Sequence, residues 1–185
     1  MLKFLQDAIA IFRLRFQNVE HYRYPPTVML AALLILSMVN AGLFAAYIGT
    51  PPAVTVGLMV GITAVKWLTL AFVMQIFLHY KGAPKMNLLG FVLLSEFLNV
   101  PLIVMSYAPA LAIIGLAWQF WALLVQIRGL LHFSRVQPIW LLLAYLLYAV
   151  AASLLGMLVL SFFVANGWID AEAMLQQMKA AQSVQ

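Results

Sequence analysis

Long apolar runs, separated by loops of only a few residues, constrain the fold of this chain more than any other feature. Of its 185 residues, 66% are hydrophobic and 8% are charged, and the mean hydropathy is +1.03. A water-soluble domain needs far more polar surface than this composition supplies. A helix of about 20 apolar residues crosses a bilayer core about 30 Å thick, and several runs reach that length. The sequence therefore predicts an integral membrane protein.

We expect an all-α fold, a polytopic bundle of five transmembrane helices with an amphipathic interfacial helix before it. The predicted parts are the interfacial helix at 1–24, the five-helix transmembrane domain at 25–167 and a short polar C-terminal tail at 168–185. At this length there is no room for a second globular domain. The predicted spans are Thr27 to Ile48, Ala53 to Leu78, Met86 to Met105, a run around Ala108 to Gly129, and Pro138 to Ala165.

The first twenty residues carry an apolar stripe at helical spacing. The stripe consists of Leu5, Ala8, Ile9, Phe12 and Phe16, and charged or amide side chains lie largely opposite. Aromatic and aliphatic residues on one face and cations on the other favour a helix that lies in the membrane interface. The alternative is a helix that packs on a partner protein.

The basic residues predict the orientation of the chain. In a membrane protein they mark the cytoplasmic ends of the spans, so the net charge of +5 does not indicate nucleic-acid binding. Five spans place eight Lys and Arg residues on the side of the amino terminus and only Lys179 on the other. The eight are Lys3, Arg13, Arg15, Arg23, Lys81, Lys85, Arg128 and Arg135. We therefore expect a protein of the bacterial cytoplasmic membrane, with the amino terminus in the cytoplasm and the carboxyl terminus in the periplasm.

Two charges lie inside predicted spans. Lys66 is near the middle of the second span and Glu96 near the middle of the third, and Asn99 follows Glu96 by about one turn. Charges at that depth are costly and usually pair with each other or face a polar cavity. Because a short loop joins these two spans, we expect Lys66, Glu96 and Asn99 to form an intramembrane polar group.

Small and amide residues mark predicted packing faces. Helices in lipid approach closely where small residues repeat, and amide side chains hydrogen-bond across the contact. The residues expected to serve helix packing are Gly57, Gly61, Gly115, Gln119, Gln126, Ser153 and Gly156.

The chain carries little that indicates catalysis. It has no cysteine, which excludes thiolate metal sites, and no protease, zinc or phosphate-loop motif is present. We expect no enzymatic activity, no cofactor and no metal. One alternative is a haem- or quinone-binding anchor, because His79 and His132 lie near the cytoplasmic ends of their spans and two imidazoles at one depth can ligate a haem. We expect instead that both are interfacial histidines in basic loops.

Besides the spacing of the five spans, the chain has a basic Lys-Gly-Ala-Pro-Lys loop at 81–85, Pro101 late in the third span, and the stretch from Ala117 to Arg135, AWQFWALLVQIRGLLHFSR. These features resemble the Yip1 family in its short bacterial form. The resemblance implies a five-span bundle with a cytoplasmic amino terminus. The Asp-Leu-Tyr-Gly-Pro motif and the long amino-terminal region of the eukaryotic relatives are absent, so binding of small GTPases is not carried over.

These features favour a non-enzymatic membrane scaffold or accessory subunit. Its loops leave almost nothing outside the bilayer to act on a soluble substrate, so function would depend on helix faces and the basic surface. The expected partners are membrane lipids and other integral membrane proteins. A second alternative is a small transporter or proton-coupled channel that uses Lys66 and Glu96, although no inverted repeat supports it.

Overall fold

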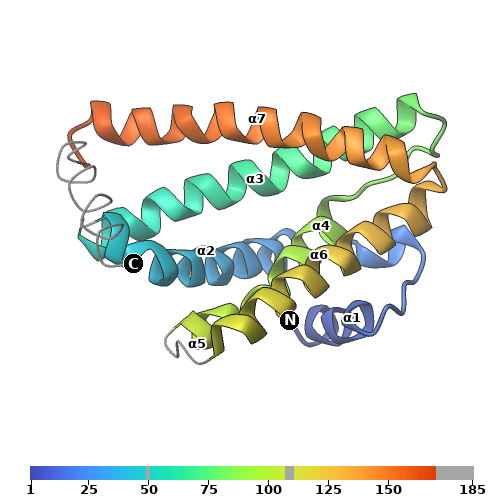
Figure 1. Ribbon diagram of the computed structural model, residues 1–185, viewed down its shortest axis with the longest axis horizontal. Coiled ribbons are helices and arrows are strands. Elements are labelled where there is room, and N and C mark those ends of the chain that lie inside the picture. The colour runs from blue at the N-terminus through green and yellow to red at the C-terminus, as the bar shows by residue number, and fades with distance from the viewer. Residues whose placement is uncertain (49–50, 107–110, 170–185) are drawn as a thin grey trace.

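The computed structural model describes residues 1–48, 51–106 and 111–169, and all regular structure in these residues is helical (Figure 1). The all-α helical bundle predicted from the sequence is confirmed. Its elements are α1 (Leu2–Phe12), the short 3₁₀ helix η1 (Val19–Tyr22), α2 (Pro26–Ile48), α3 (Pro52–Tyr80), α4 (Leu89–Phe97), α5 (Leu102–Ser106), α6 (Ala112–Ser134) and α7 (Pro138–Ala165).

Four helices of the described chain, α2, α3, α6 and α7, are long and apolar enough to cross a membrane. The predicted third span, Met86 to Met105, is not one long helix. It consists of the nine-residue α4, a turn at 98–101 and the five-residue α5. The expectation of five full transmembrane helices is therefore corrected to four long helices and one shorter, broken apolar segment.

The break follows from local chemistry. Pro101 has no N–H and its ring excludes a regular helical turn before it. The backbone there uses tight bonds between residues three apart, from Asn99 N to Glu96 O at 3.0 Å and from Leu102 N to Asn99 O at 3.0 Å. In the sequence, Pro101 lies late in a predicted span that is otherwise one continuous apolar run.

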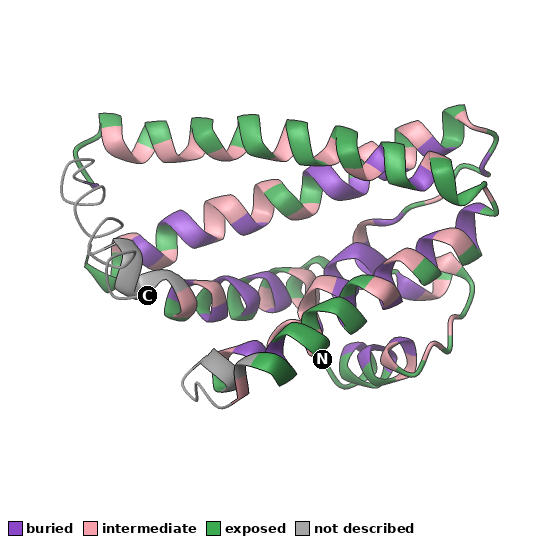
Figure 2. Cartoon of the chain, viewed as in Figure 1, coloured by how far each residue is buried: buried purple, intermediate pink, exposed green. Residues whose placement is uncertain are grey.

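The long helices run back and forth between the two ends of the molecule, and α3 lies between α2 and α7 (Figure 1). The core forms around α4, where Phe91, Val92, Leu93 and Leu94 have no exposed surface. By contrast, α7 is largely exposed, and its buried residues are Leu141 and Ala144 (Figure 2). An exposed apolar helix face is the normal condition of a helix that contacts lipid.

Two glycines allow close approaches to α4. A Cβ on Gly90 would collide with the backbone carbonyl of Tyr22, and a Cβ on Gly129 would overlap the ring of Phe91 and lie 3.0 Å from the ring of Phe16. These positions bring the amino-terminal segment and α6 onto α4. Gly90 is not among the packing residues predicted from the sequence.

Helix α1 packs on the bundle and ends earlier than predicted. Its buried residues are Phe4, Asp7, Ala8 and Ile11, whereas Leu5 and Ile9 of the predicted stripe are exposed. The rings of Phe4 and Phe97 lie 5.2 Å apart, so α1 contacts α4 directly. The prediction of one lipid-facing stripe is thus corrected to two stripes, one against the chain's own core and one exposed.

The end of α1 has a specific cause. Leu14 adopts a left-handed backbone (φ 57°), with Leu14 N bonded to Ile11 O at 2.8 Å and Arg15 N bonded to Ala10 O at 3.0 Å. This is the Schellman pattern, which usually needs glycine at the left-handed position. Since no glycine marks this end, the sequence pattern continued the helix to Phe16, which instead lies in the following loop.

A buried carboxylate secures the amino-terminal segment. Asp7, 7% exposed, accepts a hydrogen bond from the Tyr24 hydroxyl at 2.8 Å and lies 3.0 Å from His21 Nε2. Burial and the hydrogen bond to Asp7 raise the pKa of Tyr24, so the phenol stays protonated and donates. Because the folded pKa exceeds the unfolded value, this contribution to stability is present below about pH 10 and is lost as the pH rises further.

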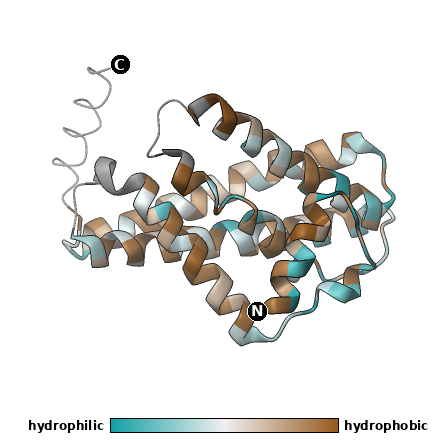
Figure 3. Ribbon diagram, turned by 90° about the horizontal axis from the view of Figure 1, so that it is seen from below, coloured by the Kyte–Doolittle hydropathy of each residue, from teal (hydrophilic) through white to brown (hydrophobic). Residues whose placement is uncertain are grey.

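Most of the charged loops lie at one end of the bundle. Figure 3 shows hydrophilic ribbon concentrated where α3 ends, α7 begins and the amino-terminal segment packs. This agrees with the one-sided distribution of Lys and Arg in the sequence.

The predicted tail is described only at its beginning. Lys179 and the rest of 170–185 lie outside the described residues. Ile169 is buried against Ala41, Leu58 and Met59.

We predict that Gly129→Ala destabilises the bundle by about 1–3 kcal/mol, because overpacking forces the buried Phe91 ring to move. Gly156→Ala is the matched control, since a Cβ there would meet no atom within 4 Å. Thermal unfolding in detergent measures both. Equal midpoints for the two variants would contradict the close α4–α6 approach.

We predict that Asp7→Ala releases the segment before α2, because the buried Tyr24 hydroxyl loses its acceptor at a cost of about 1–3 kcal/mol. Limited proteolysis should then cleave residues 1–24 faster than in the parent protein. Gln6→Ala, a change at the exposed neighbouring position, should leave the cleavage rate unchanged. Unaltered protection in Asp7→Ala would show that apolar packing alone holds α1.

Candidate functional site

A cavity of about 350 Å³ lies beside the turn between α4 and α5, bordered also by α2, α3 and α6. Seven of its twelve lining residues are polar or charged, and we call it the polar cavity. These seven are Asn40, Lys66, Ser95, Glu96, Asn99, Gln119 and Gln126. Lys66 lies at the middle of α3, so the cavity is at the depth where a bilayer core would surround the bundle.

Gln126 of α6 is the centre of a buried hydrogen-bond network. Its amide Nε2 donates to Ser95 Oγ at 2.9 Å and to Glu96 Oε1 at 3.2 Å, and its Oε1 accepts from the Tyr145 hydroxyl at 2.8 Å. One side chain therefore connects α4, α6 and α7. Such a network is stabilising when each polar atom is satisfied, because the surrounding dielectric is low.

Two indoles hold α4 at its ends. Trp67 of α3 donates to the carbonyl of Leu89 at 2.8 Å, and Trp118 of α6 donates to the carbonyl of Leu98 at 2.7 Å. The second bond satisfies a backbone acceptor next to the broken turn, where regular helical partners are lost. The tryptophans thus position the segment that carries Glu96.

Lys66 and Glu96 line the same cavity but are not in direct contact. The ion pairs within 4.0 Å in the described residues are His21–Asp7 and Arg23–Glu20, both in the amino-terminal segment. Glu96 bonds to Gln126 instead, and Lys66 is exposed. The predicted polar group of Lys66, Glu96 and Asn99 therefore does line one cavity, the polar cavity. Lys66 and Glu96 do not form a salt bridge there, because the shorter α4 is held against α6.

The predicted packing residues divide into two groups. A Cβ on Gly61 would lie 3.1 Å from Val159, and one on Gly57 would lie 3.8 Å from Phe163, so this pair serves the contact of α3 with α7. Gly115 and Gln126 are buried on α6, whereas Gln119 is exposed at the polar cavity.

The predicted packing role of Ser153 and Gly156 is not seen among residues 1–48, 51–106 and 111–169. Ser153 is exposed, and no heavy atom lies within 4 Å of a Cβ built on Gly156. The reason is that α7 uses only a narrow stripe against its neighbours.

The structure does not bring the two candidate haem ligands together. His79 lies 3.0 Å from the carbonyl of Ala83 through Nδ1, and His132 stacks on Phe16 with ring centroids 5.8 Å apart. They line different cavities. The described part of the chain holds no group of three or more His, Cys, Asp or Glu side chains suited to a metal ion.

Sequence reasoning missed two members of the site. Tyr145 lies near the start of α7, where amphipathic aromatic residues favour the headgroup region, yet its hydroxyl reaches the buried Gln126. Asn40, a polar residue of α2, donates to Thr63 Oγ1 at 3.1 Å and lines the polar cavity. The sequence did carry one signal for the inward position of Tyr145: its hydroxyl lies about two turns inside the predicted span, too deep for the headgroup region.

Comparison with protein-family models, curated proteins and solved structures finds no match to this chain. The resemblance to the Yip1 family stays a prediction from the spacing of the spans and the segment Ala117 to Arg135.

We predict that Tyr145→Phe destabilises the protein by about 1 kcal/mol through loss of its hydrogen bond to Gln126. Tyr148→Phe is the control, because this neighbouring tyrosine contacts Tyr145 through its ring. In a Gln126→Leu background, the effect of Tyr145→Phe should disappear. An undiminished effect in that background, measured by a double-mutant cycle in detergent, would show that Gln126 is not its partner.

Proposed function

We propose that this protein is a non-enzymatic membrane scaffold or accessory subunit that binds a polar transmembrane segment of another membrane protein at the polar cavity. The observation that supports the proposal is the exposure of polar side chains at mid-helix depth. Lys66 and Gln119 both line the polar cavity and both are exposed on the isolated chain. The surrounding helix faces are apolar.

An exposed cation at this depth needs a partner. A Lys at the bilayer centre costs about 2.5–3.5 kcal/mol on insertion scales, and the cost falls when it faces a polar group. Glu96 is already engaged with Gln126, so Lys66 depends on another acceptor. A neighbouring helix with a carboxylate or amide meets this need, because interhelical hydrogen bonds join helices in lipid.

The chemistry of the cavity supports binding over catalysis. Ser95 Oγ donates to the carbonyl of Val92 at 2.8 Å and accepts from Gln126, so its proton is not directed to a base. A serine nucleophile requires an adjacent base that takes this proton. We therefore propose no enzymatic role.

The proposed location is the bacterial cytoplasmic membrane, with the amino terminus in the cytoplasm and the carboxyl terminus in the periplasm. The support is the cluster of Lys and Arg at the end that carries α1 and the loop at 81–88. A Yip1-like role as an adaptor for other membrane proteins is consistent with this arrangement and is proposed on the resemblance alone.

A transporter is the second candidate, and the broken segment α4–α5 favours it. Non-helical backbone at membrane depth occurs where it is buried in protein or lines a water-filled cavity, and transporters bind ions at such breaks. Here Asn99 and Glu96 flank the turn and line the polar cavity.

A photo-crosslinking amino acid at Leu123, exposed at the rim of the polar cavity, tests the scaffold proposal. We expect a discrete adduct with another integral membrane protein in the native membrane, reduced at least severalfold by Lys66→Met. Leu158, exposed on α7, is the matched control position and should not give that adduct. Adducts with lipid alone at Leu123 would contradict the proposal. Ion flux through the purified protein in vesicles, abolished by Glu96→Gln, would favour the transporter.

A further inference from the structure

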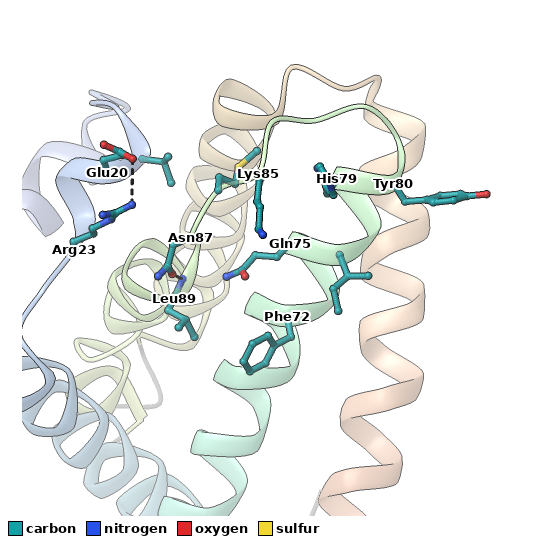
Figure 4. Close-up of a pocket in the computed structure, with 12 residues that line it drawn as sticks. Glu20, Arg23, Phe72, Gln75, His79, Tyr80, Lys85, Asn87 and Leu89 are labelled. Carbon is teal, nitrogen blue, oxygen red and sulfur yellow. Dashed lines mark hydrogen bonds and ion pairs between the residues drawn. The ribbon is translucent and has the colours of Figure 1, made fainter.

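A larger cavity of about 840 Å³ lies at the basic end of the bundle, separate from the polar cavity. It is formed by the carboxyl-terminal turns of α3, the segment at 85–89 and η1 with the residues next to it (Figure 4). Its lining has a polar part and an apolar part. We call it the basic-end cavity.

The polar part includes an unpaired buried hydrogen-bond donor and further donors near it. Gln75 Nε2 is buried and has no hydrogen-bond partner in the described chain. Asn87 uses its Oδ1 to accept from Leu89 N at 3.1 Å, which leaves its amide N–H groups as donors. In the view of Figure 4, the Lys85 ammonium and the Gln75 amide point toward one another. A buried donor left unpaired costs about 1–3 kcal/mol, so a ligand that only accepts is favoured.

The charge of the lining is also suited to an anion. Arg23 and Lys85 contribute two positive charges and Glu20 one negative charge, so the sum is +1 with His79 neutral. Glu20 Oε1 lies 3.1 Å from Arg23 Nη2, and this exposed pair leaves the other guanidinium N–H groups available. The carbonyl of Ala83 can only accept, so His79 Nδ1 carries the proton in their 3.0 Å contact.

The apolar part extends along α3 away from the charged groups. Phe72 and Ile76 line the cavity one turn apart, and they are 49% and 70% exposed. Tyr80 follows one turn later at the end of the helix. An apolar track beneath a cluster of donors, at the level where a membrane-spanning helix ends, matches the arrangement of a lipid headgroup above its acyl chains.

We propose that the basic-end cavity binds an anionic phospholipid. Its phosphate accepts hydrogen bonds from Lys85, Gln75 and Asn87 and is attracted by Arg23, and its acyl chains lie along Phe72 and Ile76. A phosphate oxygen accepts and never donates, so it matches the donor groups of Lys85, Gln75 and Asn87. This site does not depend on the scaffold function, because its residues do not line the polar cavity.

The test uses the full chain in dodecyl maltoside micelles. Fluorescent phosphatidylglycerol is the probe, and phosphatidylcholine, which has no net charge, is the comparison lipid. We expect preferential binding of phosphatidylglycerol, weakened about tenfold by Lys85→Gln and by Gln75→Leu, since each removes a bond to a charged group. Arg128→Gln is the matched control. Arg128 is an exposed basic residue in the last turns of α6, and it does not line the basic-end cavity. It should bind the probe like the parent protein.

Further arms decide the source of the phosphate and exclude misfolding. Glycerol phosphate should not displace fluorescent phosphatidylglycerol, even at a concentration at which the lipid itself saturates the site, because glycerol phosphate lacks acyl chains. Ile76→Ser, a change at an exposed position, should weaken lipid binding without lowering the unfolding temperature. An equal loss of phosphatidylglycerol binding in Arg128→Gln would show diffuse charge attraction and overturn the proposal. Competition by glycerol phosphate, or equal binding of phosphatidylcholine, would also overturn it.

Discussion

Phe91, Val92, Leu93 and Leu94 have no exposed surface, so the rest of the structure must close around α4. Helices α2, α3 and α6 and the amino-terminal segment all approach it, and at Gly90 and Gly129 the approach is so close that a Cβ would not fit. Burial of these four side chains supplies apolar contact on every side. The same burial places Ser95 and Glu96 where water is scarce, which creates the need for the bonds made by Gln126.

The broken segment links packing to function. A straight helix through Met86 to Met105 would satisfy its own backbone and leave little room beside it. The turn before Pro101 instead exposes polar backbone, which Trp118 satisfies in part, and it opens the polar cavity next to Glu96. Polar groups at this depth are costly, and a structure that keeps them has a use for them. Both functional candidates, a partner helix and a translocated ion, follow from this feature.

The amino-terminal segment has two roles that one amphipathic pattern conceals. Its buried stripe and the bonds of Asp7 fix it to the bundle, while Leu2, Leu5 and Ile9 remain exposed beside it. A helix held in this way can contact protein and lipid together. The segment also places Glu20 and Arg23 in the lining of the basic-end cavity. The position of these two residues therefore depends on the contacts of Asp7 with Tyr24 and His21.

The sequence by itself determined the membrane class, the all-α fold, the approximate limits of α2, α3 and α7 and the gathering of basic residues at one end, because these depend on composition and on local periodicity. The fourth predicted span ends near Gly129, whereas α6 continues to Ser134. Lys66, Glu96 and Asn99 could be selected as a group, since a charge in an apolar run is conspicuous. Only the tertiary structure decided that Glu96 bonds to Gln126 and not to Lys66, that Tyr145 points inward and that Asp7 is buried. These outcomes depend on the rotation and depth of each helix against its neighbours. The break at Pro101 and the glycine contacts set that rotation and depth, and they act between residues far apart in the chain.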